Sequence, residues 1–255
     1  MKYTRPPRHP LSLSIFFPCH DEEGNVERVT LEALEVGRQV AAELEVIIVD
    51  DGSRDGTAAI ADRLAATHAE VRVVRHDSNQ GYGAALRSGF RAATGDWIFY
   101  TDGDGQFDLS QLHEFLPLLE EADVFTGYRA EREDTWLRKV NAAAWNWLVR
   151  LVFRIEVKDV DCAFKIFPRT FIEATPIISN GFMIDTELLA RARGQGLTIS
   201  QRPVTHLPRV AGSACGGDWR NIVKAFRELL IVRKHLRKHG ALERQVPGEV
   251  PAESA

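Results

Sequence analysis

The chain has 255 residues, of which 44% are hydrophobic, so it can form one large α/β domain or two small ones with a sizeable core. Its formal net charge of −4 argues against a general nucleic-acid-binding protein, which is normally basic overall. Three cysteines without a Cys-x-x-Cys pair are typical of reduced thiols in a cytoplasmic protein and give no structural zinc signature.

The first half of the chain alternates between apolar runs and segments of helical spacing. The expected strands are Leu11 to Phe17, ended by Pro18, then Glu45 to Val49, Val71 to Val74, Trp97 to Tyr100 and Ala122 to Thr126. The expected helices are Asn25 to Leu44, a helix capped by Asp55 or Thr57 that ends near Thr67, Gly83 to Ala93, and Ser110 to Glu121, bent or broken at Pro117. This alternation predicts an α/β fold with a mainly parallel sheet and helices on both of its faces.

The pattern loosens after Arg129. The expected elements are a helix over Trp136 to Phe153, a strand over Ala163 to Phe167, a helix over Ile184 to Arg193, a strand over Leu197 to His206, and a last helix over Asp218 to His239. The predicted organisation is therefore a flexible leader (1–10), a main domain (11–217), a basic amphipathic helix (218–239) and a disordered tail (240–255).

Two carboxylates follow directly on the Trp97 to Tyr100 strand, in the segment Asp102-Gly-Asp-Gly-Gln106. A strand delivers the residues that follow it to the edge of a sheet, where open α/β folds bind ligands. Two carboxylates one residue apart suit a hard cation such as Mg²⁺ or Mn²⁺, and such a cation usually serves a phosphate. A solvated Asp-Gly turn is the simpler alternative for this segment taken alone.

Two further strand ends and a glycine loop carry polar residues to the same edge. Asp51 follows the second strand and Glu22 follows the first, and both can accept hydrogen bonds from a base or a ribose. The loop Asn79-Gln-Gly81-Tyr-Gly83 opens a helix, where backbone N–H groups can approach a phosphate. The sequence therefore predicts a nucleotide pocket beside a metal site.

Four ordered motifs resemble those of the family 2 glycosyltransferases, above all the dolichyl- and polyprenyl-phosphate mannose and glucose synthases. They are Pro18-Cys-His-Asp-Glu-Glu, Val49-Asp-Asp-Gly-Ser-Arg-Asp-Gly56, Asn79-Gln-Gly-Tyr-Gly-Ala-Ala-Leu86 and Asp102-Gly-Asp-Gly-Gln106, within a likeness from about Leu11 to Gly217. The resemblance implies the GT-A fold, a GDP- or UDP-hexose donor, a divalent metal and an inverting transfer.

The resemblance also implies a role for single residues. Pro18, Glu22 and Asp51 would contact the nucleotide, with Asn79 and Gly81 in the loop beside it, whereas Asp102, Asp104 and Gln106 would hold the metal and the diphosphate. The segment His206-Leu-Pro-Arg209-Val-Ala-Gly-Ser213 looks like the family's arginine-glycine-serine segment. Arg129, Arg138 and Arg209 could clamp phosphate oxygens through their fork geometry, although each could also be a surface charge. His20-Asp21 replaces the family's usual aromatic-asparagine pair, which leaves the base open.

The acceptor decides whether the reaction needs a general base. A polyprenyl phosphate is already anionic near pH 7, so positioning would dominate. A soluble hydroxyl acceptor would need a base, for which Asp185 and Glu187 are the candidates; a role as acids of the first helical turn is the alternative. A non-catalytic nucleotide-sugar or membrane-surface binding protein is a weaker hypothesis, and a Rossmann dehydrogenase is weaker still, because Leu86 stands where a third glycine is required.

Two helices carry aromatic and apolar residues at helical spacing, and the last one is also basic. Such helices usually pack on their own domain, but they can also lie on an anionic lipid surface. No apolar run approaches the roughly 20 residues of a spanning helix. The sequence therefore favours a protein at the cytoplasmic membrane face, bound peripherally or through an integral-membrane partner.

Overall fold

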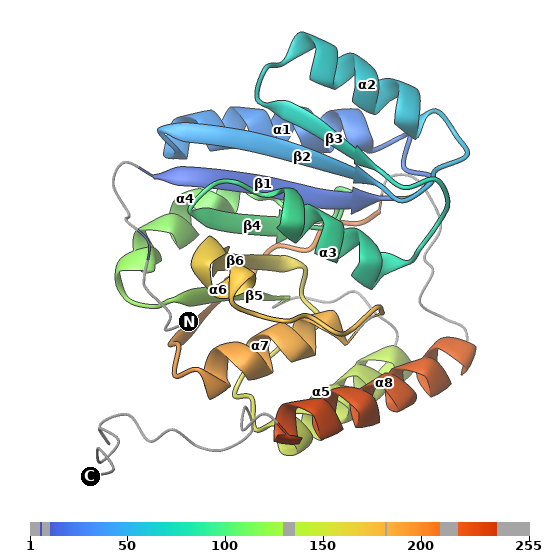
Figure 1. Ribbon diagram of the computed structural model, residues 1–255, viewed down its shortest axis with the longest axis vertical. Coiled ribbons are helices and arrows are strands. Elements are labelled where there is room, and N and C mark those ends of the chain that lie inside the picture. Colours follow the sequence, from blue (N-terminus) through green and yellow to red (C-terminus); the bar gives the residue numbers. More distant parts are fainter. Residues whose placement is uncertain (1–5, 7–10, 130–135, 182, 210–218, 239–255) are drawn as a thin grey trace.

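The computed structural model describes residues 6, 11–129, 136–181, 183–209 and 219–238, with side chains described from residue 144 in helix α5 and from residue 226 in helix α8. The expected tail, and the expected leader apart from Pro6, lie outside these residues. Figure 1 shows a central sheet, with α3 in front of it and α1 behind it, and the helices α5 and α8 together at the lower end of the view.

The sheet has seven strands in the order β3-β2-β1-β4-β6-β5-β7. The strands are β1 (Ser12–Cys19), β2 (Glu43–Asp50), β3 (Val71–Arg75), β4 (Trp97–Thr101), β5 (Val124–Arg129), β6 (Phe164–Pro168) and β7 (Ile199–Val204). Every neighbouring pair is parallel except those of β6, which runs antiparallel to β4 and β5. All residues of β4 and β6 are buried, as is typical of strands covered on both faces.

Helices cover both faces, as the alternating pattern predicts. They are α1 (Val26–Val40), α2 (Thr57–Thr67), α3 (Tyr82–Ala92), α4 (Leu112–Phe115), α5 (Trp136–Phe153), α6 (Arg169–Glu173), α7 (Ile184–Gly194) and α8 (Trp219–Lys238), with 3₁₀ turns η1 (Leu109–Gln111) and η2 (Leu116–Glu120) on either side of α4. The core is one cluster that includes the stacked rings of Phe16, Tyr100 and Phe167. The mainly parallel α/β sheet is thereby confirmed.

Two sequence expectations need correction, and a third is confirmed in part. Strand β1 continues through Pro18 to Cys19, because its pairing with β4 ends at Phe16 and the missing N–H of Pro18 removes no bond on that side. Helix α1 ends at Val40 rather than Leu44, since Leu44 pairs with Leu13 in the sheet. The helix expected over 110–121 is short, and its α-helical part ends at Phe115, before Pro117, so the predicted break is confirmed.

Candidate functional site

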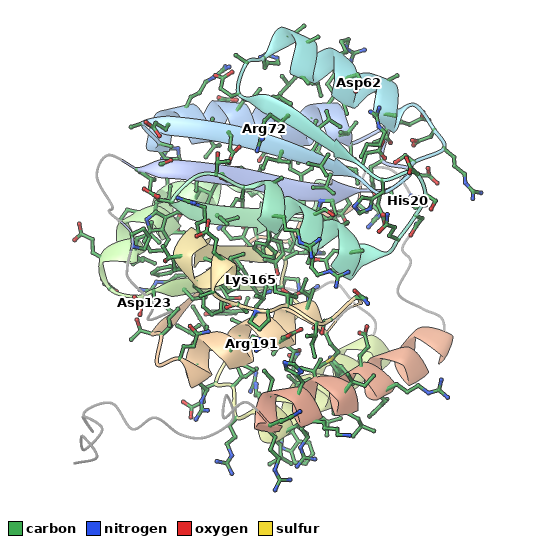
Figure 2. All side chains as sticks on the ribbon, in the orientation of Figure 1. His20, Asp62, Arg72, Asp123, Lys165 and Arg191 are labelled. Atoms are coloured by element: carbon green, nitrogen blue, oxygen red, sulfur yellow. The ribbon has the colours of Figure 1, made fainter. Side chains whose placement is uncertain are left out.

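The carboxyl ends of the parallel strands β1, β2, β3 and β4 meet at one edge of the sheet, where Figure 2 shows His20. Cys19 pairs with Asp50 in the sheet register, and the Asp51 N–H donates to the Cys19 carbonyl at 2.8 Å. A Cβ on Gly103 would lie 2.5 Å from the Pro18 carbonyl oxygen, so the loop after β4 lies directly against the end of β1. The expected convergence of strand ends is therefore present.

Asp102 and Asp104 stand together at the end of β4. The Tyr82 hydroxyl, at the start of α3, donates to Asp102 Oδ1 at 3.1 Å. Burial and the nearby Asp104 carboxylate raise the pKa of the Asp102 carboxyl to about 7, although the Tyr82 hydrogen bond lowers it. The closeness of the two carboxylates thus makes it costly to ionise both of them, a cost that a bound cation would relieve.

The donor set fits a hard divalent cation. Carboxylate oxygens are the ligands that Mg²⁺ and Mn²⁺ prefer, and two of them leave coordination positions for a diphosphate and water. Within the described part of the chain, no group of three or more His, Cys, Asp or Glu side chains is arranged to enclose a metal by itself.

Arg209 reaches this pair of carboxylates from the far end of the chain. The segment after β7 runs beside the loop after β4, because Phe107 bridges to His206 and the Leu207 N–H donates to the Gln106 carbonyl at 2.7 Å. Arg209 Nη2 lies 2.5 Å from Asp104 Oδ2, and Arg209 Nη1 lies 3.5 Å from Glu22 Oε1. Arg209 thus connects a predicted metal ligand to a predicted nucleotide residue.

Gln106 and Glu22 have partners that sequence reasoning did not foresee. The Gln106 side-chain amide donates to the Leu207 carbonyl at 3.0 Å, so it holds the Arg209 segment in place. Glu22 accepts a hydrogen bond from Asn25 at 2.6 Å. Burial raises the pKa of Glu22, and the Asn25 hydrogen bond and the Arg209 charge partly offset this effect.

Asp51 is buried and its carboxylate organises the glycine loop. It accepts from the N–H groups of Gln80 at 2.8 Å and Gly81 at 2.9 Å, and its Oδ1 lies 2.6 Å from His76 Nδ1. Gly52, with a φ of 69°, lies beneath this loop, where a Cβ would be 2.4 Å from the Ser78 carbonyl carbon. The exposed Asn79 and the helix start at Gly81 therefore lie beside Asp51, as expected.

The two other arginines have different outcomes. Arg129 makes a two-pronged ion pair with Asp159, with Nε at 2.7 Å and Nη2 at 2.9 Å from the carboxylate oxygens. Much of its hydrogen-bonding capacity is therefore already used, although its charge still lowers the pKa of Asp102. The side chain of Arg138 lies outside the described residues, so its expected role stays a prediction.

Neither carboxylate expected as a general base is accessible in this structure. Asp185 is 3% exposed and bonds to the Tyr100 hydroxyl and, at 2.7 Å, to the Lys165 ammonium group. Glu187 is 0% exposed, accepts from the N–H groups of Ile178 and Ser179, and pairs with Arg191. Both carboxylates are held by partners inside the fold around α7, and the expected role of either one as a base for a hydroxyl acceptor stays a prediction.

Lys165 is a buried cation on β6, the strand beside β4. Its side chain is fully buried, and Figure 2 shows it between the sheet and α7. In the register of β4 and β6, Lys165 lies opposite Tyr100, and Tyr100 stands two residues before Asp102 in the sequence. Burial lowers the pKa of Lys165 to about 8 and raises the pKa of Asp185. A lysine inside an apolar strand predicts that a buried acceptor or carboxylate lies beside it, and this sequence signal could have pointed to Asp185.

Comparison with known proteins gives concordant results. The model of the Glycosyl transferase family 2 matches residues 14–179. Glycosyltransferase AglD of Haloferax volcanii is 36% identical over 212 residues, covering 78% of this chain and 34% of its own length. An undecaprenyl-phosphate 4-deoxy-4-formamido-L-arabinose transferase of Aeromonas hydrophila is 30% identical over 67% of this chain and 56% of its own length. A dolichyl-phosphate beta-glucosyltransferase of Trichomonas vaginalis is 29% identical over 63% and 52%. The chain thus spans about a third to just over half of these relatives.

Solved structures show the same fold at lower identity. Glucosyl-3-phosphoglycerate synthase from Mycobacterium tuberculosis, in complex with UDP, is 19% identical with a TM-score of 0.67, over 91% of this chain and 87% of that one. Mannosyl-3-phosphoglycerate synthase from Rubrobacter xylanophilus is 18% identical with a TM-score of 0.67, over 94% and 79%. These likenesses confirm the expected GT-A fold.

Proposed function

This chain belongs to glycosyl transferase family 2, and we propose that it transfers a hexose, mannose or glucose, with inversion from a nucleotide-diphosphosugar to a polyprenyl phosphate. The observation that carries the proposal is the cluster of Asp102, Asp104, Glu22 and Arg209 at the carboxyl ends of the parallel strands. It offers carboxylates for a cation and a guanidinium for phosphate at one place, which is what a sugar-diphosphate donor requires.

Asp102 and Asp104 would hold Mg²⁺ or Mn²⁺. When bound, the cation supplies charge neutralisation that makes the nucleoside diphosphate a better leaving group. Structures of the glucosyl-3-phosphoglycerate synthase with Mn²⁺ and UDP support this choice. The contribution of Tyr82 is to fix the orientation of Asp102, and that of Arg209 is to fix Asp104 and then to bind phosphate oxygens.

A phosphate acceptor fits the surroundings of the site better than a hydroxyl acceptor. Two of the relatives are named for undecaprenyl-phosphate and dolichyl-phosphate reactions. A phosphate nucleophile is anionic near pH 7 and needs no general base, which agrees with the burial of Asp185 and Glu187. Such an acceptor lies in a membrane, so we expect the protein to work at the cytoplasmic membrane face, directly or through an integral-membrane partner.

The hydrogen bonds of Asp51 favour a uracil base in the donor. A carboxylate offers about four acceptor positions, and the Asp51 carboxylate already uses three for Gln80, Gly81 and His76. Among the described residues, this leaves one position for a ligand. Uracil presents a single N–H, at N3, whereas guanine presents N1–H and an N2 amino group side by side to one carboxylate. We therefore propose a UDP-hexose donor, and Asp51 as the acceptor for its base.

The test is a transfer assay with the purified full chain, Mn²⁺ and a detergent-dispersed polyprenyl phosphate. Labelled UDP-glucose and GDP-mannose are compared, and organic-soluble label is counted. We expect label from the UDP-sugar, and a loss of about 10²-fold or more in Asp104→Asn. Asp96→Asn, at the other end of β4, is the matched control and should keep its activity. No lipid-linked product with either donor, or transfer only to soluble hydroxyl acceptors, would overturn the proposed acceptor.

A further inference from the structure

Helices α5 and α8 expose an unusual number of large apolar side chains. Seven such side chains are exposed among the described residues, and five of them lie on these two helices: Trp147, Leu151, Phe226, Leu230 and Ile231. Trp147 is 64% exposed and Leu230 is 62% exposed. Monomeric proteins rarely gather exposed apolar groups in this way, and such clusters mark interaction surfaces.

These apolar side chains are exposed although both helices also bury apolar side chains in the core. The inward side of α5 buries Val149 and Phe153, and the inward side of α8 buries Leu229, Val232 and Leu236. The two helices also contact each other, through Trp145 and Phe226 with ring centroids 5.5 Å apart, and they lie together in Figure 1. Trp147 and Leu151 are four residues apart and form a second, outward stripe on α5. On α8, Leu230 and Ile231 are exposed beside Phe226, whose ring is only partly covered by Trp145.

The same surface is strongly cationic, although the whole chain has a net charge of −4. Between Phe226 and Lys238, helix α8 carries one acidic residue, Glu228, and five cationic residues that are all exposed: Arg227, Arg233, Lys234, Arg237 and Lys238. A helix with exposed aromatic and aliphatic residues among lysines and arginines has the composition that anionic bilayers bind.

We propose that the outward faces of α5 and α8 form a docking surface for the headgroup region of an anionic lipid bilayer. The apolar side chains would enter the interface, and the five cations of α8 would meet lipid phosphates. A second copy of this chain fits the surface poorly, because it would bring two such cationic helices together. In the described residues no helix is long and apolar enough to cross a membrane, so this contact would be superficial.

The docking surface is connected to the site by direct packing. A Cβ on Gly181 would lie 2.6 Å from Glu228 Oε2, so α8 contacts the segment before α7. The same segment contacts α3, because a Cβ on Gly83 would lie 2.4 Å from the Asn180 carbonyl carbon. Gly83 follows Tyr82, which binds Asp102. Docking would therefore place the bilayer near the reaction centre, a consequence that rests on the proposed function.

Vesicle flotation of the full chain tests the surface without using activity. Vesicles of phosphatidylcholine alone are compared with vesicles that also contain phosphatidylglycerol. We expect binding to the anionic vesicles only, weakening as salt is raised. Arg233→Gln and Arg237→Gln should each lower the partition constant by about fivefold, whereas Arg91→Gln on α3 should not.

Leu230→Ser removes an apolar contact and is matched by Leu31→Ser, an exposed leucine of α1. We expect only Leu230→Ser to release the protein, with circular dichroism unchanged in both variants. Equal binding to vesicles with and without phosphatidylglycerol would overturn the proposal, and so would equal vesicle binding by the two serine variants. So would self-association on sedimentation that Leu230→Ser abolishes, since it would assign the surface to a second copy. Transfer that fails while flotation succeeds would count against the proposed function alone.

Discussion

Removing the Tyr82 hydroxyl should weaken metal binding without disturbing the fold. Tyr82→Phe deletes one oxygen, which donates to Asp102 Oδ1 at 3.1 Å. A hydrogen bond to a charged group contributes about 1.5–3 kcal/mol, and the loss of a partner that orients a metal ligand costs about 10- to 100-fold in affinity. Asp102 is partly exposed, so water can replace some of the lost bond. We therefore expect the lower end, a decrease of about tenfold.

The assay is a titration with Mn²⁺ in the presence of UDP, followed by electron paramagnetic resonance. The signal reports free Mn²⁺, so the assay needs no sugar acceptor. Tyr128→Phe is the matched control, since it removes the same atom from β5, where the Tyr128 ring contacts Lys158. At saturating Mn²⁺, the transfer rate of Tyr82→Phe should return towards that of the unaltered protein. A dissociation constant within about twofold of the original value would refute the role given to Tyr82.

Three further predictions concern the same framework. Arg209→Met should lower kcat/KM by about 10²-fold, with Arg209→Lys in between, because lysine keeps the charge but not the fork; equal rates for both variants would contradict this. Lys165→Met should lower the free energy of unfolding in urea by about 3–5 kcal/mol, and adding Asp185→Leu should recover much of the loss. Gly52→Ala should lower the free energy of unfolding by more than the roughly 1–2 kcal/mol that a left-handed backbone conformation costs an alanine, because the new Cβ would also collide with Ser78. Gly196→Ala, at an exposed position with a φ of 78°, should show the conformational cost alone.

The arrangement of the site was predictable wherever polar residues directly follow a buried strand. Glu22, Asp51 and Asp102 follow β1, β2 and β4, and the parallel order of these strands brings them to one edge. The boundaries were less predictable. Leu44 fits a helix or a strand equally well by hydropathy, and only its pairing with Leu13 decides between them.

Long-range partners could not be read from the sequence. Lys165 and Asp185 are 20 residues apart, and only the antiparallel placement of β6 beside β4 and the position of α7 bring them together. The Gln106 side-chain amide donates to the Leu207 carbonyl, a partner 101 residues further along the chain, and its expected role as a metal ligand stays a prediction. Tyr82 stood within a recognised glycine motif, yet nothing in that motif indicates a hydroxyl aimed at Asp102.

If helix α8 docks on lipid as proposed, Arg209 stands along the chain between the proposed donor site and the docking surface. Its Nη2 lies 2.5 Å from Asp104 Oδ2, an oxygen that a cation would also require, so the arrival of a metal and diphosphate must change this ion pair. The segment that carries Arg209 is fixed to the loop after β4 by Gln106, and the chain needs only residues 210–218 to pass from Arg209 to helix α8. If donor binding alters docking, linkage requires that docking alters donor affinity by the same factor.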